Sequence, residues 1–313
     1  MDWSQTAFIF PGQGSQKVGM GADFYATSPA AKAIFDEADD VLETGFSALI
    51  FEGPAAELDD TYNTQAALYV CGVAGLAALQ EAIPTARAIC LAGHSLGEFT
   101  ALTASGALSF ADGLRLVRER GRLMREAGQR NAGAMAALLG ASLDVAHEIC
   151  TAATLQTSAP VVIANDNCPG QVVISGAIPA VDRAIALAAQ KGVSRAVKLA
   201  VSVAAHSPLM ASSADAFRET LAQTPINPPQ IPVYGNVSAA PLADVDAIRA
   251  ELDRQLTEPV RWTPSVQAMI RDGAVNFVEI GAGNVLAGLV KRIERKAGRY
   301  VVEDMAGVSA LAG

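Results

Sequence analysis

Residues 91–110, LAGHSLGEFTALTASGALSF, place a serine between two glycines directly after a short apolar run. The run has the character of a buried strand, and a helical pattern begins at about Ser95. The pentapeptide GHSLG at 93–97 fits G-x-S-x-G, in which the glycines let a strand turn sharply into a helix and the serine projects at the helix N-terminus. Ser95 is therefore either a nucleophile on a strained turn or a helix cap. Serine is a preferred residue at a helix N-terminus, so the position is also compatible with a cap. The strand–turn–helix context favours the nucleophile.

The sequence around this segment alternates short β-rich runs with longer helical patterns. This alternation is typical of a mainly parallel sheet covered by helices. Strands are predicted over 6–10, 86–93 and 275–283, and an amphipathic helix over 111–128. The Pro-rich stretch 224–235 indicates a stiff connection into a further strand. We therefore expect an α/β fold.

The middle of the chain has a different pattern, in which short strands and two helices form a separate group. The predicted strands are 133–140, 161–165, 171–176 and 195–201, and the predicted helices are about 143–153 and 178–191. Their order, β-α-β-β-α-β, is that of a ferredoxin-like α+β unit. We interpret residues 131–198 as a small subdomain inserted into a larger body formed by residues 1–130 and 199–313.

Composition and charge argue against several functional classes. The 313-residue chain carries a net charge of −9, which disfavours nucleic acid or an anionic membrane as the main partner. No apolar run approaches about 18 residues, and the N-terminus lacks the features of a signal peptide, so a cytoplasmic location is expected. The cysteines fit neither zinc spacing nor a disulfide framework and are predicted to be buried thiols: Cys71, Cys90, Cys150 and Cys168. Three dispersed histidines also argue against a metal site.

A nucleophilic serine needs a base, and the chain contains three histidines. His94 adjoins Ser95 and is expected to point elsewhere, and His147 is expected on the polar face of a helix. His206 follows an apolar run and precedes a turn, so elimination makes it the best candidate. No Asp or Glu between Ser95 and His206 stands out as the acid of a hydrolase triad, so another group is expected to orient His206.

Two glycine-rich segments, 10–21 and 279–289, have the appearance of nucleotide-binding loops but match neither common fingerprint. Lys17 and Leu286 stand where a dinucleotide-binding loop requires its third glycine, and the Gly-Lys-Ser/Thr of a Walker A loop is absent. We therefore expect no nicotinamide dinucleotide at either segment. The segment 10–21 is still able to aim a backbone N–H at a reacting carbonyl.

Arg120 has two interpretations. It lies in the helix predicted over 111–128, beside Gly121, and composition alone indicates a solvated arginine among several others. The alternative is a bidentate grip on a substrate carboxylate, for which the planar guanidinium is suited.

Seven segments occur in the order found in one enzyme family. They are FPGQGSQKVGMG (10–21), GHSLGEFTAL (93–102), RERGRLM (118–124), NDNCPGQVVISG (165–176), AVSVAAHSPLM (200–210), RQLTEPVRW (254–262) and EIGAGNVLAGLVKRI (279–293). On these segments the chain resembles the malonyl-CoA:acyl-carrier-protein transacylases, from Phe8 to about Ile293. Its length suits the stand-alone form that serves fatty acid synthesis.

The resemblance implies an α/β-hydrolase-like body with a ferredoxin-like insert, and it implies roles for four residues. Ser95 would be the acylated nucleophile, and His206 its base and later acid. A backbone carbonyl at Gln255 would orient the histidine. Arg120 would bind the free carboxylate of the malonyl group.

The resemblance also implies further site residues and the partners. Backbone N–H groups of Gln13 and Leu96 would form the oxyanion hole, and Asn165 and Asn167 would lie beside the cleft. The enzyme would pass the malonyl group from malonyl-CoA to the phosphopantetheine thiol of acyl carrier protein by ping-pong chemistry. It would need no bound cofactor and no metal, and a monomer is expected.

Two features leave alternatives open. Ala205 stands where relatives usually carry Ser or Phe, a choice linked to acyl-group size, so acceptance of methylmalonyl groups is an alternative. An acidic carrier protein needs a cationic surface, and a cluster near the end of the chain is either that surface or a solvated helix face: Lys291, Arg292, Arg295 and Lys296.

Three other functions compete with malonyl transfer for fatty acid synthesis. The first is an acyltransferase of a polyketide or malonate decarboxylase system. The second is a serine thioesterase, against which Arg120 argues because hydrolysis of neutral acyl groups needs no buried cation. The third is a non-catalytic binding subunit, which the presence of Ser95, His206, Arg120 and Gln13 disfavours.

Overall fold

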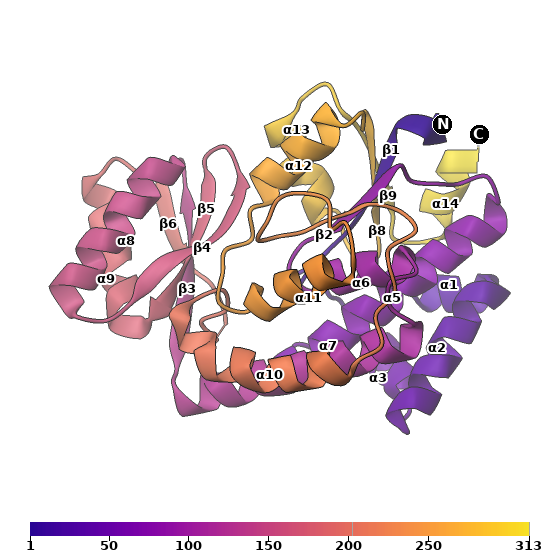
Figure 1. Cartoon of the computed structure of the whole chain (residues 1–313), viewed down its shortest axis with the longest axis horizontal. Coiled ribbons are helices and arrows are strands. Elements are labelled where there is room, and N and C mark those ends of the chain that lie inside the picture. Colours follow the sequence, from indigo (N-terminus) through magenta and orange to yellow (C-terminus); the bar gives the residue numbers. More distant parts are fainter. Residues whose placement is uncertain (202, 313) are drawn as a thin grey trace.

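The computed structural model describes residues 1–201 and 203–312, and within them it contains two sheets surrounded by helices (Figure 1). Residues 202 and 313, which fall in the predicted body segment 199–313, lie outside the described residues. Helices that the following paragraphs do not discuss are η1 (Trp3–Gln5), α1 (Ala22–Thr27), α2 (Pro29–Leu42), α3 (Phe46–Glu52), α4 (Ala55–Leu58), η2 (Pro208–Met210), α10 (Ala211–Gln223) and α14 (Met305–Ala312). Among the described helices, none is both long enough and apolar enough to cross a membrane.

The larger sheet is parallel, as the sequence predicts. Its described strands follow the order β7 (Val233–Tyr234), β2 (Cys90–Gly93), β1 (Thr6–Phe10), β8 (Asn276–Ile280) and β9 (Gly298–Val302). Because the carboxyl ends of parallel strands meet at one edge of a sheet, the loops after β1 and β7 lie beside the turn that follows β2. The turn at Ser95 therefore has neighbours that are remote in sequence.

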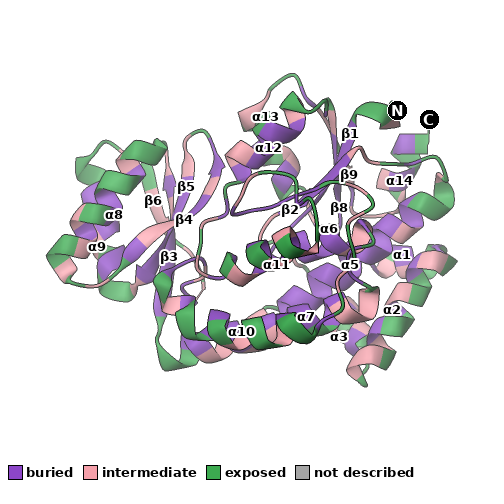
Figure 2. Ribbon diagram, viewed as in Figure 1, coloured by how far each residue is buried: buried purple, intermediate pink, exposed green. Residues whose placement is uncertain are grey.

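The side chains of β1 alternate between two hydrophobic cores, one on each face of the sheet. Phe8 and Phe10 pack in the core with α5 (Thr61–Ala82), α6 (Gly97–Ala104) and α7 (Phe110–Arg130). Ala7 and Ile9 pack in the core with α12 (Trp262–Arg271) and α13 (Val285–Ile293). This is the period-2 pattern of a strand covered on both faces. Figure 2 shows the buried residues concentrated on the strands of the larger sheet and on α5.

Two strands predicted for the larger sheet are shorter than the sequence indicates, and the strand predicted over 195–201 also ends early, at Lys198. The strand predicted over 86–93 begins at Cys90, because the chain before it turns, with Ala86 N–H bonded to the Ile83 carbonyl. The strand predicted over 275–283 ends at Ile280, because Gly281 has a φ of +122° and leaves the extended conformation. Beyond the strand ends both runs continue with mostly small or apolar residues, so periodicity alone could not locate the ends.

The second sheet is antiparallel and has the order β4 (Val161–Cys168), β5 (Gln171–Ala177), β3 (Gly133–Leu139) and β6 (Arg195–Lys198) in the described residues. The chain adds α8 (Leu143–Thr157) and α9 (Ile178–Gln190), and these pack on one face of the sheet around a core of their own. Met135 and Val173 lie on the other face, where they line the cavity that contains Ser95.

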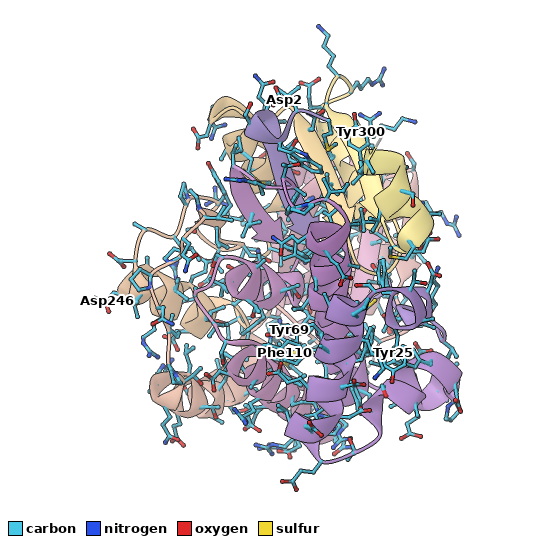
Figure 3. The ribbon with its side chains drawn as sticks, turned by 90° about the vertical axis from the view of Figure 1, so that its right-hand side faces the viewer. Asp2, Tyr25, Tyr69, Phe110, Asp246 and Tyr300 are labelled. Carbon is cyan, nitrogen blue, oxygen red and sulfur yellow. The ribbon has the colours of Figure 1, made fainter. Side chains whose placement is uncertain are left out.

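Close packing between α5 and α7 sets the position of the helix that carries Arg120. The rings of Tyr69 and Phe110 stack with their centroids 5.5 Å apart, and the Tyr69 hydroxyl donates to the Phe110 carbonyl at 3.0 Å (Figure 3). A Cβ on Gly113 would lie 2.2 Å from the Tyr69 hydroxyl, and one on Gly121 would lie 3.0 Å from the Thr61 carbonyl. Glycines at both positions therefore let α7 approach α5.

The cysteines are buried and free, as predicted: Cys71, Cys90, Cys150 and Cys168. Burial raises the pKa of the Cys71, Cys90 and Cys150 thiols to about 12. These thiols are protonated at neutral pH and are therefore poor nucleophiles.

Candidate active site

Ser95 lies on a strained turn between β2 and α6. Its φ is +51°, in the left-handed region that residues other than glycine seldom adopt. Helix α6 begins at Gly97 with Leu96 as its N-cap residue, and the Ser95 hydroxyl contacts His206 and Arg120 rather than a helix N–H. The helix-cap interpretation of Ser95 is therefore wrong. The turn directs the hydroxyl toward two other side chains.

The two glycines of this turn are required by close approach of the backbone. A Cβ built on Gly93 would lie 1.9 Å from the carbonyl oxygen of Gly97, and one built on Gly97 would lie 2.1 Å from the carbonyl oxygen of Phe10. Neither position has room for a side chain. The G-x-S-x-G spacing is thus a steric requirement of this strand–turn–helix.

Gly93→Ala should lower the free energy of unfolding by at least about 2 kcal/mol, because backbone atoms must move to admit the methyl group. Urea denaturation measures this loss. The matched control is Gly288→Ala in α13, where a Cβ would meet nothing within 4 Å and the change should stay within about 1 kcal/mol. Equal stability of Gly93→Ala and the unmodified protein would contradict the tight turn.

His206 is the histidine that the structure brings to Ser95. Its Nε2 lies 2.9 Å from Ser95 Oγ, and its Nδ1 lies 2.8 Å from the Gln255 carbonyl oxygen and 3.1 Å from that of Glu258. Carbonyl oxygens only accept hydrogen bonds, so Nδ1 carries the proton and Nε2 of the neutral ring accepts from the serine hydroxyl. Two backbone carbonyls thus occupy the place that a carboxylate takes in many triads.

Arg120 is a buried cation beside the serine. Its side chain is 1% exposed, Nη2 donates to Ser95 Oγ at 3.0 Å, and Nη1 donates to Gln65 Oε1 at 2.6 Å. Among the described residues, no carboxylate lies within ion-pair distance of this guanidinium, and its Nε has no hydrogen-bond partner. A buried cation without a counter-ion is costly, so the site favours an anionic ligand.

Burial and nearby charge shift three pKa values in the site. Burial, assisted by the positive charge of Arg120, lowers the pKa of His206 to about 3. Burial lowers the pKa of Arg120 to about 10, so the guanidinium stays charged at neutral pH. Burial, followed by the neighbouring carboxyl of Glu251, holds the pKa of Glu98 well above its usual range. The site therefore combines a neutral base with a permanent cation.

The backbone N–H groups near Ser95 differ in whether they donate a hydrogen bond within the described residues. The Ser95 N–H donates to Asn236 Oδ1 at 2.6 Å. The N–H groups of Leu96 and Gln13 have no hydrogen-bond partner among the described residues. Both residues line the same cavity as Ser95, and the Gln13 side chain donates to Thr61 Oγ1 at 3.2 Å.

The remaining predicted residues also lie at this cavity. Asn167 Oδ1 is 2.8 Å from His94 Nε2, so His94 points away from Ser95 as expected. Asn165 is buried, forms a β-bridge with Val260 and lines the cavity. His147 is exposed on α8, as its place on a polar helix face predicts.

Three buried polar residues contact the site and were not identified from the sequence. Asn236 binds the Ser95 turn, Gln65 binds Arg120, and Glu98 accepts a hydrogen bond from the Gln255 side chain. For Asn236 a signal was present, because it lies two residues after the end of β7, the strand into which the Pro-rich stretch leads. Gln65 and Glu98 lie directly before apolar runs, and nothing in their spacing distinguishes them.

The cavity has a volume of about 250 Å³ and is mostly apolar apart from the groups already described. Ala205 lines it together with Met124, Met135 and Val203. No group of three or more His, Cys, Asp or Glu side chains in the described residues is arranged to hold a metal ion. The chemistry available here is that of a serine, a neutral histidine and an arginine.

The cationic cluster lies at the end of α13, whose N-terminal residues line the cavity. All four members are exposed: Lys291, Arg292, Arg295 and Lys296. Arg292 donates to Gln171 Oε1 at 2.9 Å and to the Pro169 carbonyl at 3.1 Å, so it ties α13 to the β4–β5 turn. The other three make no side-chain ion pair within the described part of the chain.

Comparison with known proteins gives a consistent result over the whole chain. The family model for the acyl transferase domain matches residues 7–309. Among curated relatives, the malonyl CoA-acyl carrier protein transacylase of Bacillus subtilis (strain 168) is 45% identical over 301 residues, which cover 96% of this chain and 94% of the relative.

Solved structures agree with this match. The malonyl-CoA:acyl carrier protein transacylase of Xanthomonas oryzae pv. oryzae has a TM-score of 0.94 and 45% identity, covering 99% of this chain and 98% of that chain. A chain from a solved complex of a type II PKS acyl-carrier protein with its malonyl-transacylase also matches. It has a TM-score of 0.94 and 40% identity, and the match covers 98% of this chain and 98% of that chain.

Proposed function

The chain belongs to the acyl transferase domain family, and on that premise we propose that it transfers the malonyl group of malonyl-CoA to the phosphopantetheine thiol of acyl carrier protein. One observation carries the proposal most directly: the guanidinium of Arg120 is buried, has no carboxylate partner in the described residues and lies 3.0 Å from Ser95 Oγ. A malonyl group brings a free carboxylate to this point. A neutral acyl group would leave the cation unpaired.

In the first half of the reaction, Ser95 Oγ attacks the thioester carbonyl of malonyl-CoA while His206 Nε2 takes the hydroxyl proton. Arg120 releases the serine oxygen and binds the malonyl carboxylate. The N–H groups of Leu96 and Gln13 stabilise the oxyanion that forms on the carbonyl oxygen. The carbon–sulfur bond then breaks, and His206 gives the proton to the departing CoA sulfur, which leaves as the thiol.

In the second half, the phosphopantetheine thiol of the carrier protein enters the same cavity. His206 takes the thiol proton, the sulfur attacks the malonyl-serine carbonyl, and the ester bond to Ser95 Oγ breaks. His206 then returns the proton to the serine. The mostly apolar walls disfavour water beside the ester, which supports transfer over hydrolysis.

Intact mass spectrometry of the protein mixed with malonyl-CoA alone, and then with holo carrier protein, tests the function. We expect a malonyl adduct that peptide mapping places on Ser95, that is absent in Ser95→Ala, and that moves to the carrier protein. An adduct that decays to free malonate in the presence of carrier protein would instead identify a thioesterase. No adduct from malonyl-, methylmalonyl- or acetyl-CoA would favour a binding subunit.

The pathway and the acyl range belong to the same proposal. Supply of malonyl groups to fatty acid synthesis in the cytoplasm, with no bound cofactor, is the function that the length and motifs favour. The structural similarity to a malonyl-transacylase of a type II PKS supports a polyketide carrier protein as the second candidate. Ala205, whose methyl side chain leaves space at the cavity wall, supports a test with methylmalonyl-CoA as a competing donor.

The division of the chain is part of the proposal as well. Residues 131–198 have their own antiparallel sheet and their own core, which supports a subdomain inserted into the body formed by residues 1–130 and 199–313. The face of this sheet that is not covered by α8 and α9 forms one wall of the cavity. The insert would therefore limit the space around the acyl group.

The rate of Ser95 malonylation should be nearly independent of pH from 8 down to 5. The pKa of His206 is lowered to about 3, so the neutral imidazole is lost only as the pH falls toward that value. Single-turnover rates at saturating malonyl-CoA measure this, with circular dichroism at each pH as the control for folding. A rate that falls by half near pH 6.5, the ordinary histidine pKa, would contradict the assignment.

A further inference from the structure

Asn236 contacts the residues on both sides of His94 in the serine turn. Its Oδ1 accepts from the Ser95 N–H at 2.6 Å, and its Nδ2 donates to the Gly93 carbonyl at 2.7 Å. The side chain is buried, with the residue 1% exposed, and its amide reaches this turn from the end of β7, 141 residues away in sequence. One planar amide thus connects the last residue of β2 with the serine.

This contact decides which N–H groups can meet the reacting carbonyl. A serine that uses its own N–H for an oxyanion would need that N–H free. Here Asn236 occupies it, and the N–H groups of Leu96 and Gln13 are the ones without partners among the described residues. The amide also stabilises the φ of +51° at Ser95, because both of its bonds exist only when the turn is closed.

Glu98 and Gln255 extend the same contacts to the histidine. The Glu98 carboxyl accepts from the Asn236 backbone N–H at 3.3 Å and from the Gln255 side-chain amide. The Gln255 amide also donates to the Ser95 carbonyl at 3.0 Å, and the Gln255 carbonyl accepts from His206 Nδ1 at 2.8 Å. One carboxyl on α6 therefore joins the segment that holds the serine to the segment that holds the histidine.

We propose that Asn236 is a positioning residue for Ser95, which closes the serine turn and keeps the Ser95 N–H away from the oxyanion, and that Glu98 anchors it. The proposal rests on the proposed acyl transfer at Ser95. It adds a requirement that the transfer mechanism alone does not contain: an amide that accepts and donates at the same time.

Asn236→Asp tests this requirement, because the protonated and ionised forms of the introduced carboxyl differ in one hydrogen bond, the one to the Gly93 carbonyl. A neutral carboxyl can accept from Ser95 N–H and donate to the Gly93 carbonyl, whereas a carboxylate can only accept. We expect Ser95 malonylation to be about 10- to 100-fold slower than in the unmodified protein at pH 8. The ratio should recover to within about threefold as the pH falls to about 4.5.

The groups around Asn236 set where the introduced carboxyl titrates. Burial raises its pKa, and the carboxyls of Glu98 on α6 and Glu251 on α11 (Val245–Arg254) act in the same direction wherever they are ionised. Arg261, whose backbone N–H donates to the Asn236 carbonyl, opposes this shift. Dividing each rate by that of the unmodified protein at the same pH corrects for the pH dependence that the two proteins share.

Asn63→Asp is the matched control. The Asn63 amide also accepts with its oxygen, from Arg118, and donates with its nitrogen, to the Glu57 carbonyl, but it lies away from the serine turn. This variant should keep the rate of the unmodified protein at every pH. Asn236→Asp as fast as the unmodified protein at all pH values, or slowed equally at all of them, would overturn the proposal.

A second variant covers the case in which Asn236→Asp does not fold. Asn236→Ala should slow malonylation at least about tenfold, while the double variant Ser95→Ala/Asn236→Ala should bind malonyl-CoA as tightly as Ser95→Ala alone. A loss of binding that matches the loss of rate would mean a merely structural role. If the unmodified protein forms no malonyl adduct at Ser95, the proposed function fails instead, so the two failures are distinct.

Discussion

His206→Ala should slow malonylation of Ser95 by about 10³- to 10⁴-fold, the upper range for loss of a general base. The carbonyls of Gln255 and Glu258 hold the proton on Nδ1, which leaves Nε2 as an acceptor 2.9 Å from Ser95 Oγ. Without the ring, Arg120 is the one remaining hydrogen-bond partner of the hydroxyl in the described part of the chain, and a guanidinium cannot accept a proton. Single-turnover formation of the malonyl adduct, followed by mass spectrometry, measures the loss.

His147→Ala is the control for this variant, since His147 is exposed on α8 and should leave the rate unchanged. Free imidazole added to His206→Ala should restore part of the rate, because it can enter the space that the ring vacates. A loss of less than about tenfold would remove His206 from the role of base.

Arg120→Ala should lower malonyl transfer by about 10²- to 10³-fold while acetyl transfer is kept or increased. The guanidinium is buried and has no carboxylate partner in residues 1–201 and 203–312, so in the variant a bound malonyl carboxylate would lose this cation and remain desolvated. An acetyl group has no carboxylate to lose, and removal of the cation makes the cavity less costly for a neutral group. The ratio of kcat/KM for malonyl-CoA to that for acetyl-CoA reports the change.

Arg118→Ala is the matched control, because Arg118 lies on the same helix and its guanidinium stacks 3.5 Å from the centre of the Tyr62 ring instead of entering the site. It should leave the malonyl to acetyl ratio unchanged. Measurement at pH 8 keeps His206 neutral in both variants, since loss of the Arg120 charge raises the His206 pKa from about 3. Equal losses for both acyl groups in Arg120→Ala would make Arg120 structural.

These two variants separate two roles at one serine. The histidine acts on the hydroxyl, so its removal should affect malonyl, methylmalonyl and acetyl donors alike. The arginine acts on the carboxylate, so its removal should affect the dicarboxylic acyl groups alone. A selectivity change in His206→Ala would therefore contradict the proposed mechanism as clearly as its absence in Arg120→Ala.

The sequence by itself determined the local parts of this protein. The glycines of GHSLG are there because no Cβ fits at Gly93 or Gly97, and such a requirement is visible in a single short segment. Alternating strand and helix patterns were sufficient for the parallel sheet. Arg120 carried a signal that composition concealed, because helical spacing places it in line with the buried Leu116 and Met124.

Only the tertiary structure decided what meets at Ser95. Its hydroxyl contacts lie 25 and 111 residues away and the amide that holds its N–H lies 141 residues away. No periodicity links such positions. Asn236 reaches the turn because β7 and β2 are neighbours in the sheet and their carboxyl ends share one edge. Arg120 reaches it from α7, and His206 from the segment before η2, where its backbone N–H donates to the Leu256 carbonyl. The roles of Asn236 and Glu98 were decided in the same way, because a buried polar residue acquires its role from partners that distant segments supply.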